Sequence, residues 1–329
     1  MDRKKVEDDA NEVKNIFINN PQIKEIFDDI SDCREFSDGK HEPECMIVVG
    51  DTGAGKTTII NKYLAQNPRT ETNEGAVIPI LSTSLPPNAT PITASEQLLS
   101  DLGDPFAFSR GNDPVKIAKE VADLMKSCEV ELIIIDEFQH MIDRKKKEVL
   151  HSAADWLKML IVRSKIPVVL FGMPYSVVIL EANRQLAGRF ELQHKLEPFR
   201  LNNKSNRALY KTFLVMLDNA LPFKESSDLA TTDMMKRIYA FSDGNLRRIR
   251  RLINRASRYA QIANSSKILL SHFAKAAPKI SKSACEEQNP FDAEVNVSKL
   301  KLKQPPEDIG WENYFHQQEE KNVKVKDIF

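Results

Sequence analysis

The chain has 329 residues, with 47 Lys and Arg against 47 Asp and Glu, so its formal net charge is zero. This balance excludes a uniformly basic or acidic protein, and any surface that binds a polyanion must therefore be local. The length allows a large core, and we expect one main domain followed by a smaller one.

Composition also limits the chemistry and the setting of the protein. The four cysteines, Cys33, Cys45, Cys128 and Cys285, are scattered without a CxxC pair, which supports neither a disulfide framework nor a zinc site. The chain opens with MDRKKVEDDA, and no apolar run approaches the roughly 20 residues that a membrane span needs. We therefore expect a soluble, cytoplasmic protein without a membrane partner.

The first two thirds of the chain predict an α/β domain. Residues 1–40 are polar with a thin apolar stripe, which predicts an N-terminal helical extension. Across residues 41–200, apolar runs alternate with helical patterns, as in a parallel sheet sandwiched by helices. The runs are MIVV, AVIPIL (76–81), LIII (132–135), VVLF (168–171) and ELQHKL (191–196). The stretch LSTSLPPNATPITASEQ predicts a loop after the second run.

The last third predicts helices and then a tail. Residues 201–282 lack a convincing strand and carry apolar residues at three- and four-residue steps, so we expect a small all-helical domain. Residues 283–329 are polar, contain prolines and show no sustained period, which predicts a flexible tail. The tail contains the aromatic group WENYF (311–315), which would either dock into a partner or fold back on the core.

The stretch VVGDTGAGKTTII holds the full phosphate-binding loop pattern. Its glycines allow a tight turn whose N–H groups point at phosphate oxygens, at the N-terminus of the following helix. Lys56 would contact the β- and γ-phosphates as a catalytic residue, and Thr57 would ligate Mg²⁺. The predicted nucleotide-binding residues of the loop are Gly50, Asp51, Thr52, Gly53, Ala54, Gly55, Lys56, Thr57 and Thr58.

The run ELIII ends in two adjacent carboxylates, Asp136 and Glu137. Asp136 would hold Mg²⁺ through its water shell, and Glu137 would polarise the attacking water as a catalytic residue. Such a pair is common at solvated strand ends, but together with the phosphate-binding loop it indicates ATP hydrolysis. ATP and Mg²⁺ are therefore the expected cofactors.

These stretches, with IIIDEFQH and the helical segment GNLRRIRRLINRA, resemble the AAA+ ATPases over roughly residues 30–280. Within that class, DEFQH and FGMP are most similar to the TnsC/TniB group of transposition regulators. The resemblance implies an ATPase that oligomerises as a ring or helical filament on duplex DNA. It would couple a target-selection protein of the TniQ/TnsD type to transposase subunits, and hydrolysis would control disassembly. The helical domain would be the lid.

Two other functions stay open at this point. One is a nucleotide-switch signalling ATPase that binds protein partners and no DNA. The other is an ATPase of the replication-initiator or helicase-loader type, although a helix-turn-helix that would read DNA is not visible after the helical domain.

The resemblance also assigns roles to single residues. An arginine finger precedes the last strand, and Arg189 is the first choice for it and Arg184 the second. Such a finger would neutralise charge on the γ-phosphate of the adjacent subunit. Arg247 matches the sensor-2 position of the lid. The run VVLF ends in Gly172-Met173, where many AAA+ enzymes carry a polar residue, so turnover is expected to be slow.

Two basic segments remain. The tetrad Arg144-Lys145-Lys146-Lys147 follows the Asp-Glu strand, in a region that can project toward a central channel in the AAA+ fold. There it would contact duplex DNA without sequence specificity, and an ordinary solvated charge run is the alternative. Between Lys236 and Arg258 there are eight Lys and Arg against one acid. Six arginines fall on one predicted helix, and at 3.6 residues per turn they are not expected to share one face.

Overall fold

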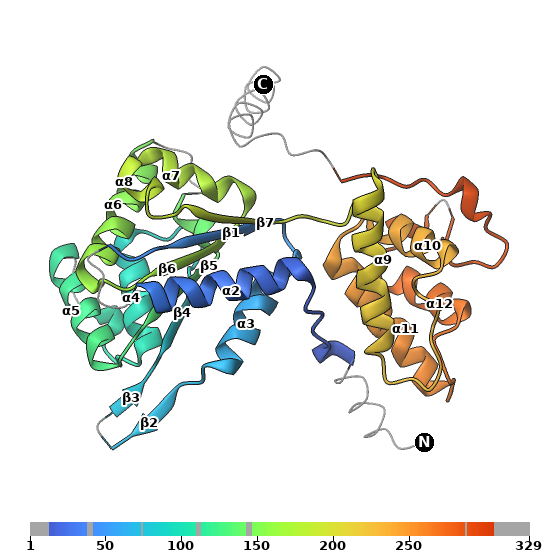
Figure 1. Ribbon diagram of the computed structural model, residues 1–329, viewed down its shortest axis with the longest axis horizontal. Helices are drawn as coiled ribbons and strands as arrows, with labels where there is room; N and C mark the ends of the chain where they lie inside the picture. Colours follow the sequence, from blue (N-terminus) through green and yellow to red (C-terminus); the bar gives the residue numbers. More distant parts are fainter. Residues whose placement is uncertain are drawn as a thin grey trace. The chain divides into compact units, whose positions relative to one another are not determined.

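The computed structural model describes residues 13–37, 42–73, 75–109, 113–142, 147–286 and 288–305. The described residues form two compact units (Figure 1). Pro21–Leu196 makes an α/β unit, and residues 13–20 join the described residues from Glu197 to Pro305 in a helical unit. Within the described ranges, no helix is both long and apolar enough to cross a membrane.

The α/β unit holds all strands of the described chain, together with the first helices. Its elements are α2 Pro21–Phe36, β1 Met46–Gly50, α3 Lys56–Gln66, β2 Thr70–Thr72, β3 Gly75–Val77, β4 Ile80–Ser84, α4 Pro91–Leu102, η1 Ala107–Ser109, α5 Pro114–Ser127, β5 Leu132–Asp136, η2 Phe138–Met141, α6 Lys147–Ser164, β6 Val168–Gly172, η3 Pro174–Val177, α7 Val178–Ala182, α8 Arg184–Ala187 and β7 Leu192–Leu196, where η marks a 3-10 turn. The helical unit contains α9 Lys204–Asn219, α10 Thr232–Ser242, α11 Leu246–Ile262, α12 Leu270–Ile280, η4 Ser283–Cys285 and η5 Val297–Lys299.

Five strands pair in parallel in the order β4-β5-β6-β1-β7, which confirms the predicted sheet. On β1, Met46 is opposite Val169 of β6 and Leu192 of β7. On β5, Ile135 is opposite Leu170 of β6. Because the strands are parallel, the carboxyl ends of β1, β6 and β5 lie next to one another at one edge. The loops that follow these three strands therefore meet there.

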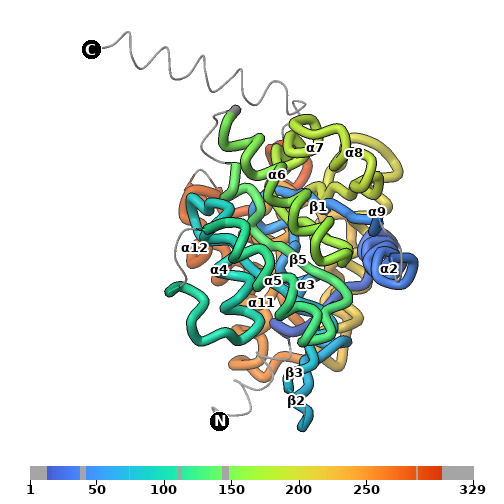
Figure 2. Tube along the Cα trace, turned by 90° about the vertical axis from the view of Figure 1, so that its left-hand side faces the viewer, coloured from blue at the N-terminus to red at the C-terminus, as the bar shows by residue number. Residues whose placement is uncertain are grey.

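Successive strand residues point to opposite sides of the sheet, and helices bury both faces of its central strands. Ile47 and Ile133 pack with the helices α4 to α7 on one face. Val48 and Ile134 pack with α2 and α3 on the other face. Figure 2 shows α4, α5 and α6 as neighbours on the first face. Burial on both sides explains why these strands read as continuous apolar runs.

The second predicted strand, AVIPIL, is in fact divided. Its first part belongs to β3, which pairs antiparallel with β2 in a separate hairpin. Its last part begins β4 of the main sheet, and Pro79 lies between them. Proline lacks the N–H that would continue a ladder, so the run bends out of one sheet and into the other.

The stretch predicted as a loop contains the first turns of α4. Thr93 N donates to Thr90 Oγ1 at 3.2 Å, and Thr90 N donates back to Thr93 Oγ1 at 2.8 Å. Pro91 occupies the first helical position, where its missing N–H carries no cost. Because of this reciprocal capping box, a helix begins in a segment whose composition is typical of a loop.

The helical unit includes segments that precede and follow its four helices in the sequence. Residues 288–305, which the composition placed in a flexible tail, pack on this unit instead. Phe291 is 1% exposed and stacks on Phe273 with ring centroids 5.3 Å apart. The guanidinium of Arg237 donates to three backbone carbonyls of the same segment. The aromatic group 311–315 lies outside the described residues.

The N-terminal extension is shared between the two units. Val13 and Ile18 are buried in the core of the helical unit. Arg250 on α11 donates to the carbonyls of Val13 and Ile16 at 2.9 and 3.0 Å. From Pro21 onward the chain belongs to the α/β unit, so the extension is not a separate element.

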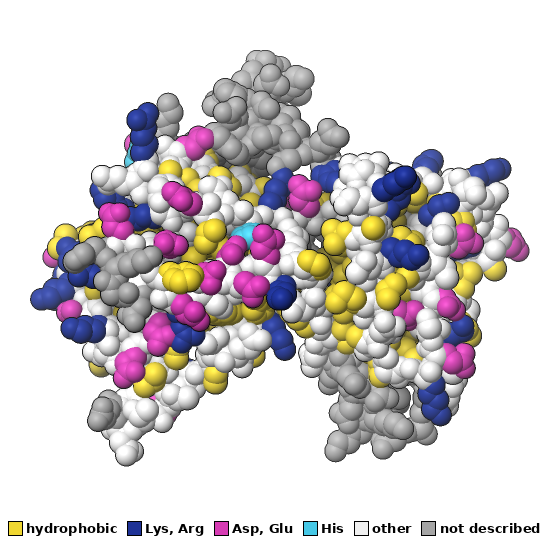
Figure 3. Space-filling view, in the orientation of Figure 1, with side chains coloured by type: hydrophobic (Ala, Val, Ile, Leu, Met, Phe, Trp, Pro, Cys, Tyr) yellow, Lys and Arg dark blue, Asp and Glu magenta, His cyan; other side chains and the backbone are white. Residues whose placement is uncertain are grey.

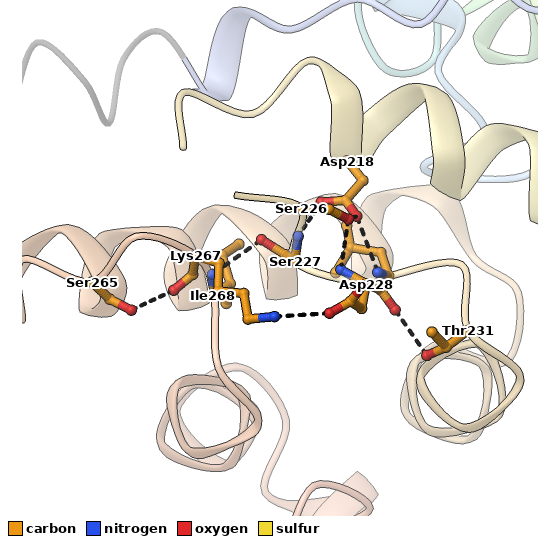
Figure 4. Close-up of polar contacts among 9 residues, drawn as sticks. Asp218, Ser226, Ser227, Asp228, Thr231, Ser265, Lys267 and Ile268 are labelled. Atoms are coloured by element: carbon orange, nitrogen blue, oxygen red, sulfur yellow. Dashed lines mark hydrogen bonds and ion pairs between the residues drawn. The ribbon is translucent and has the colours of Figure 1, made fainter. Parts of the chain in front are cut away.

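A polar network fixes the loop after α9 (Figure 4). The Asp218 carboxylate accepts hydrogen bonds from Ser226 Oγ at 2.8 Å, Ser227 N at 2.9 Å and Leu229 N at 3.2 Å. Ser227 Oγ accepts from Ile268 N at 3.0 Å. Loop N–H groups outside secondary structure need partners of this kind, so we interpret this acidic residue as structural.

Although the net charge is zero, helix α2 carries a local concentration of acidic residues. The exposed side of α2 is acidic, and Figure 3 shows the acidic side chains on this part of the α/β unit. The exposed acids of α2 are Glu25, Asp28, Asp32 and Glu35. A surface of this kind repels phosphates.

Candidate nucleotide-binding site

The loop between β1 and α3 depends on its glycines. Gly53 and Gly55 have φ values of 88° and 105°, a region that side chains rarely allow. Gly50 has no space for a side chain, because an added Cβ would lie 2.9 Å from the Leu196 carbonyl oxygen and 3.1 Å from the Ala54 Cβ. The three glycines thus permit the tight turn that leads into α3.

The N-terminus of α3 is suited to an anion. No side chain caps this helix, whose N-cap is Gly55. Helix N-termini carry partial positive charge and free N–H groups, which bind phosphate. The first residue of α3, Lys56, is only 7% exposed, and its ammonium donates to the Gly50 carbonyl at 2.5 Å and the Asp51 carbonyl at 3.3 Å. Its charge is therefore held at the loop.

Thr57 and Asp136 come together from two parts of the chain. Thr57 Oγ1 donates to Asp136 Oδ2 at 3.1 Å. Burial raises the pKa of the Asp136 carboxyl above its usual value, and the hydrogen bond from Glu137 N at 2.8 Å opposes this shift. Hydroxyl and carboxylate oxygens are ligands that Mg²⁺ prefers, and a bound cation would favour the charged carboxylate. The pair would suit a Mg²⁺ ion, and Thr57 and Asp136 are the residues that would hold it.

Glu137 is held in an unusual backbone conformation. Its φ of 56° lies in the left-handed region, which is strained for a residue with a side chain. The Glu137 carboxylate accepts a hydrogen bond from Gln139 Nε2. Gln139 Oε1 in turn accepts one from Met173 N at 3.2 Å. An amide nitrogen donates and an amide oxygen accepts, so both partners require the same orientation of this side chain.

Gln139 is a residue of this site that the sequence analysis did not single out. It is 4% exposed and connects the end of β5 to the end of β6. The Met173 thioether lies 3.8 Å from Thr52 Oγ1 in the phosphate-binding loop. A Cβ on Gly172 would lie 2.4 Å from Ser176 Oγ and 3.3 Å from Gln139 Oε1. Gln139 thus brings a polar group to the strand end where Met173 supplies none, and Gly172 leaves room for it.

The two arginines predicted as the finger differ in side-chain exposure and in ion pairing. The Arg189 side chain is 13% exposed and pairs with Glu42 at 3.1 Å. Arg184, the first residue of α8, is exposed and makes no side-chain hydrogen bond or ion pair with the described residues. The Asn183 side chain caps this short helix by accepting from Gln185 N at 2.9 Å. Of the two, Arg184 is the one that can reach outward.

The remaining predicted site residues belong to the helical unit or lie outside the described residues. Arg247 is exposed in the first turn of α11, in the helical unit, and its contact with nucleotide stays a prediction. Arg144, Lys145 and Lys146 lie outside the described residues, as does the side chain of Lys147. Their contact with DNA also stays a prediction.

The fold and this site together define an ATPase fold of the AAA+ class. Similar solved structures include Aeropyrum pernix ORC2 in ADPNP-ADP complexes, with TM-score 0.54 and 14% identity over 87% of this chain and 71% of that chain. Pyrobaculum aerophilum Cdc6p gives TM-score 0.57 and 15% identity over 83% and 70%. Aeropyrum pernix ORC1 in complex with DNA gives 0.53 and 14% over 80% and 66%. At these identities the similarity shows the fold alone.

The family follows from the sequence itself. The model of the family described as "Bacterial TniB protein" matches residues 11–201, which is more than half of the chain. The chain therefore belongs to the TniB family, and the resemblance stated above is confirmed. No curated protein sequence matched the chain.

Proposed function

We propose that this protein is an ATP-hydrolysing regulator of DNA transposition. In the ATP-bound state its copies assemble side by side on duplex DNA and link a target-selection protein of the TniQ/TnsD type to transposase subunits. Hydrolysis then dismantles or resets the assembly. The observation that carries this proposal is the Thr57–Asp136 pair beside a phosphate-binding loop, in a chain of the TniB family.

The site residues divide the chemistry among them. Lys56 would bind the β- and γ-phosphates, and Thr57 and Asp136 would hold Mg²⁺, which would neutralise phosphate charge. Glu137 polarises the attacking water, and Gln139 holds its carboxylate through one oxygen, which leaves the other oxygen for the water. The apolar Met173 at the end of β6 favours slow turnover. Slow turnover suits a protein that times an assembly better than one that drives continuous movement.

The finger is best assigned to Arg184. A residue that acts on a neighbouring subunit must be exposed and unpaired in its own subunit, and Arg184 meets both conditions among the described residues. Arg189 is engaged with Glu42, which supports a structural role for it. The assignment thus reverses the order of preference that the sequence suggested.

DNA enters the proposal through the family and the fold. The solved Aeropyrum pernix ORC1 structure, which shares the fold, is a complex with DNA. The tetrad Arg144–Lys147 remains the proposed loop for non-specific contacts with the DNA backbone. Net neutrality of the chain means that such contacts must come from local groups of cations.

Lys56→Ala should weaken ATP binding by roughly 10- to 100-fold, because it removes a charge-assisted contact with the terminal phosphates. Titration with a fluorescent ATP analogue measures the change. The matched control is Lys62→Ala, which removes an exposed lysine from the same helix. Equal affinities for wild type and Lys56→Ala would contradict the assignment of this loop.

Electron microscopy tests the assembly directly. We expect rings or filaments on duplex DNA with a non-hydrolysable ATP analogue, and dispersed protein with ADP. The alternative of a signalling ATPase predicts no DNA-bound particles in any nucleotide state. Particles that form with the analogue but never include DNA would refute the DNA part of the proposal and leave self-assembly standing.

A further inference from the structure

Helix α11 presents a face made of arginine. The helix has six arginines and no acidic residue among its 17 residues. Successive residues are about 100° apart around a helix, so five of the arginines fall within an arc of about 100°. These five, all exposed, are Arg247, Arg248, Arg251, Arg255 and Arg258. The buried residues of α11 occupy the opposite side. The expectation that the arginines would be dispersed therefore holds only for Arg250.

The charge of this arginine face is almost unopposed. Arg248 pairs with Asp243 at 2.7 Å. The side chains of Arg251, Arg255 and Arg258 make no hydrogen bond or ion pair with any residue that the structure describes. Arg250, by contrast, is turned toward the carbonyls of the N-terminal segment. The chain thus uses one arginine of α11 for structure and leaves the others to the surface.

Such an arrangement works against the helix itself. Like charges three and four residues apart repel each other and destabilise a helix, and surface helices commonly offset this with acids at the same spacing. No acid of α11 does so. A polyanion bound to the face would remove the repulsion. Folding alone gives no reason for the missing acids, whereas binding a polyanion does.

The chemistry and spacing fit DNA phosphates. Guanidinium groups stay charged at all physiological pH values and bind phosphate oxygens through a planar fork of N–H donors. At 1.5 Å per residue, Arg247 and Arg258 are about 16 Å apart along the axis of α11. Duplex DNA carries one negative charge per about 1.7 Å of its axis, so several phosphates lie within this length.

We propose that the arginine face of α11 binds the phosphate backbone of duplex DNA, as a second DNA contact besides the tetrad Arg144–Lys147. This inference rests on the proposed function, because it assigns further residues to the same DNA complex. The contact reads no bases, since arginines that meet only phosphates carry no sequence information.

The test uses the full-length protein carrying Arg251→Gln, Arg255→Gln and Arg258→Gln together. Arg247 stays intact because it is the predicted sensor-2 residue. With an ATP analogue, anisotropy of a labelled duplex should show at least a tenfold loss of affinity near 0.1 M salt. The logarithmic salt slope should become shallower by about 0.9 for each phosphate that the variant no longer neutralises. The triple Arg→Lys variant keeps the charges and should retain most of the affinity.

The control variant removes the same charge from another helix. Lys116, Lys119 and Lys126 are exposed on α5, where Glu120 and Asp123 lie between them. Changing these three lysines to Gln should leave DNA affinity unchanged within about twofold, because the number of neutralised phosphates, and not the net charge, sets the slope. Thermal unfolding followed by circular dichroism checks that each variant is folded.

Each other outcome has a separate meaning. If the wild type fails to bind duplex at low salt with the analogue, the proposed function itself fails. If the wild type binds and the Arg→Gln variant binds equally well with the same salt slope, only the inference about α11 fails. The acidic face of α2 in a second copy is the competing partner. If the Arg→Gln variant loses nucleotide-dependent self-association without DNA, in sedimentation velocity, the arginine face binds another subunit and the assignment to DNA is overturned.

Discussion

Replacing Glu137 with glutamine should leave ATP binding unchanged and lower the rate of ATP hydrolysis on the order of 10²- to 10⁴-fold. The carboxamide keeps nearly the same shape as the carboxylate but is a poor base for the attacking water. Phosphate release measured at saturating ATP gives the rate, and titration with a fluorescent ATP analogue gives the affinity.

Glu129 provides a matched control for this experiment. It lies before β5, at the opposite end of that strand from Glu137, and has a similar left-handed backbone with φ of 54°. Glu129→Gln makes the same chemical change in the same backbone conformation but far along the strand from the phosphate-binding loop. It should hydrolyse ATP at the wild-type rate. Normal hydrolysis by Glu137→Gln would place the base elsewhere.

Gln139 orients the Glu137 carboxylate. In the structure Glu137 Oε2 accepts a hydrogen bond from Gln139 Nε2, which leaves the other carboxylate oxygen to polarise water. Gln139 also binds Met173 N, which lies at the end of the strand between β5 and β1. Met173 also contacts Thr52 of the phosphate-binding loop. A movement of Met173 can therefore shift the Glu137 carboxylate through the Gln139 side chain alone.

The sequence predicted the parts of the molecule that depend on local patterns. A phosphate-binding loop needs glycines at fixed positions between a strand and a helix, and the chain shows all of these within a short stretch. The parallel sheet follows from apolar runs that alternate with helices, because strands covered on both faces are apolar throughout. The convergence of Thr57 with Asp136 follows from the same reasoning, since Asp136 ends β5 and Thr57 follows β1 in one parallel sheet.

The rest could not be predicted, because it depends on contacts between distant residues. Arg189 and Glu42 are 147 residues apart, so no local pattern indicates their ion pair. Gln139 is conspicuous only once Met173 N is seen beside it. Phe291 lies in a polar stretch, and its ring, the carbonyls that Arg237 binds and the Gln304 side chain all help to hold that stretch on the helical unit. Composition averages over such single anchors.

Replacing Arg184 with alanine should lower hydrolysis by the assembled protein by about 10³- to 10⁵-fold, the effect of an arginine finger. Nucleotide binding by the isolated subunit should survive, because Arg184 has no contact with its own phosphate-binding loop among the described hydrogen bonds. Hydrolysis is measured with duplex DNA and protein above the concentration needed for assembly. Arg189→Ala is the comparison. We expect it to lower the melting temperature, because it breaks the ion pair with Glu42, and to leave hydrolysis by the folded protein close to the wild-type rate.

Mixing two inactive variants tests whether neighbouring subunits build the active site together. In an assembly of Arg184→Ala and Glu137→Gln subunits, some interfaces combine an intact Glu137 from one subunit with an intact Arg184 from the next. Random mixing at equal amounts gives such interfaces about one time in four, so activity should recover to about a quarter of wild type. If mixing restores nothing, Arg184 does not act across an interface. If Arg189→Ala is inactive and Arg184→Ala normal, the Arg189–Glu42 pair must open during assembly, and Glu42→Ala should then leave hydrolysis intact or raise it.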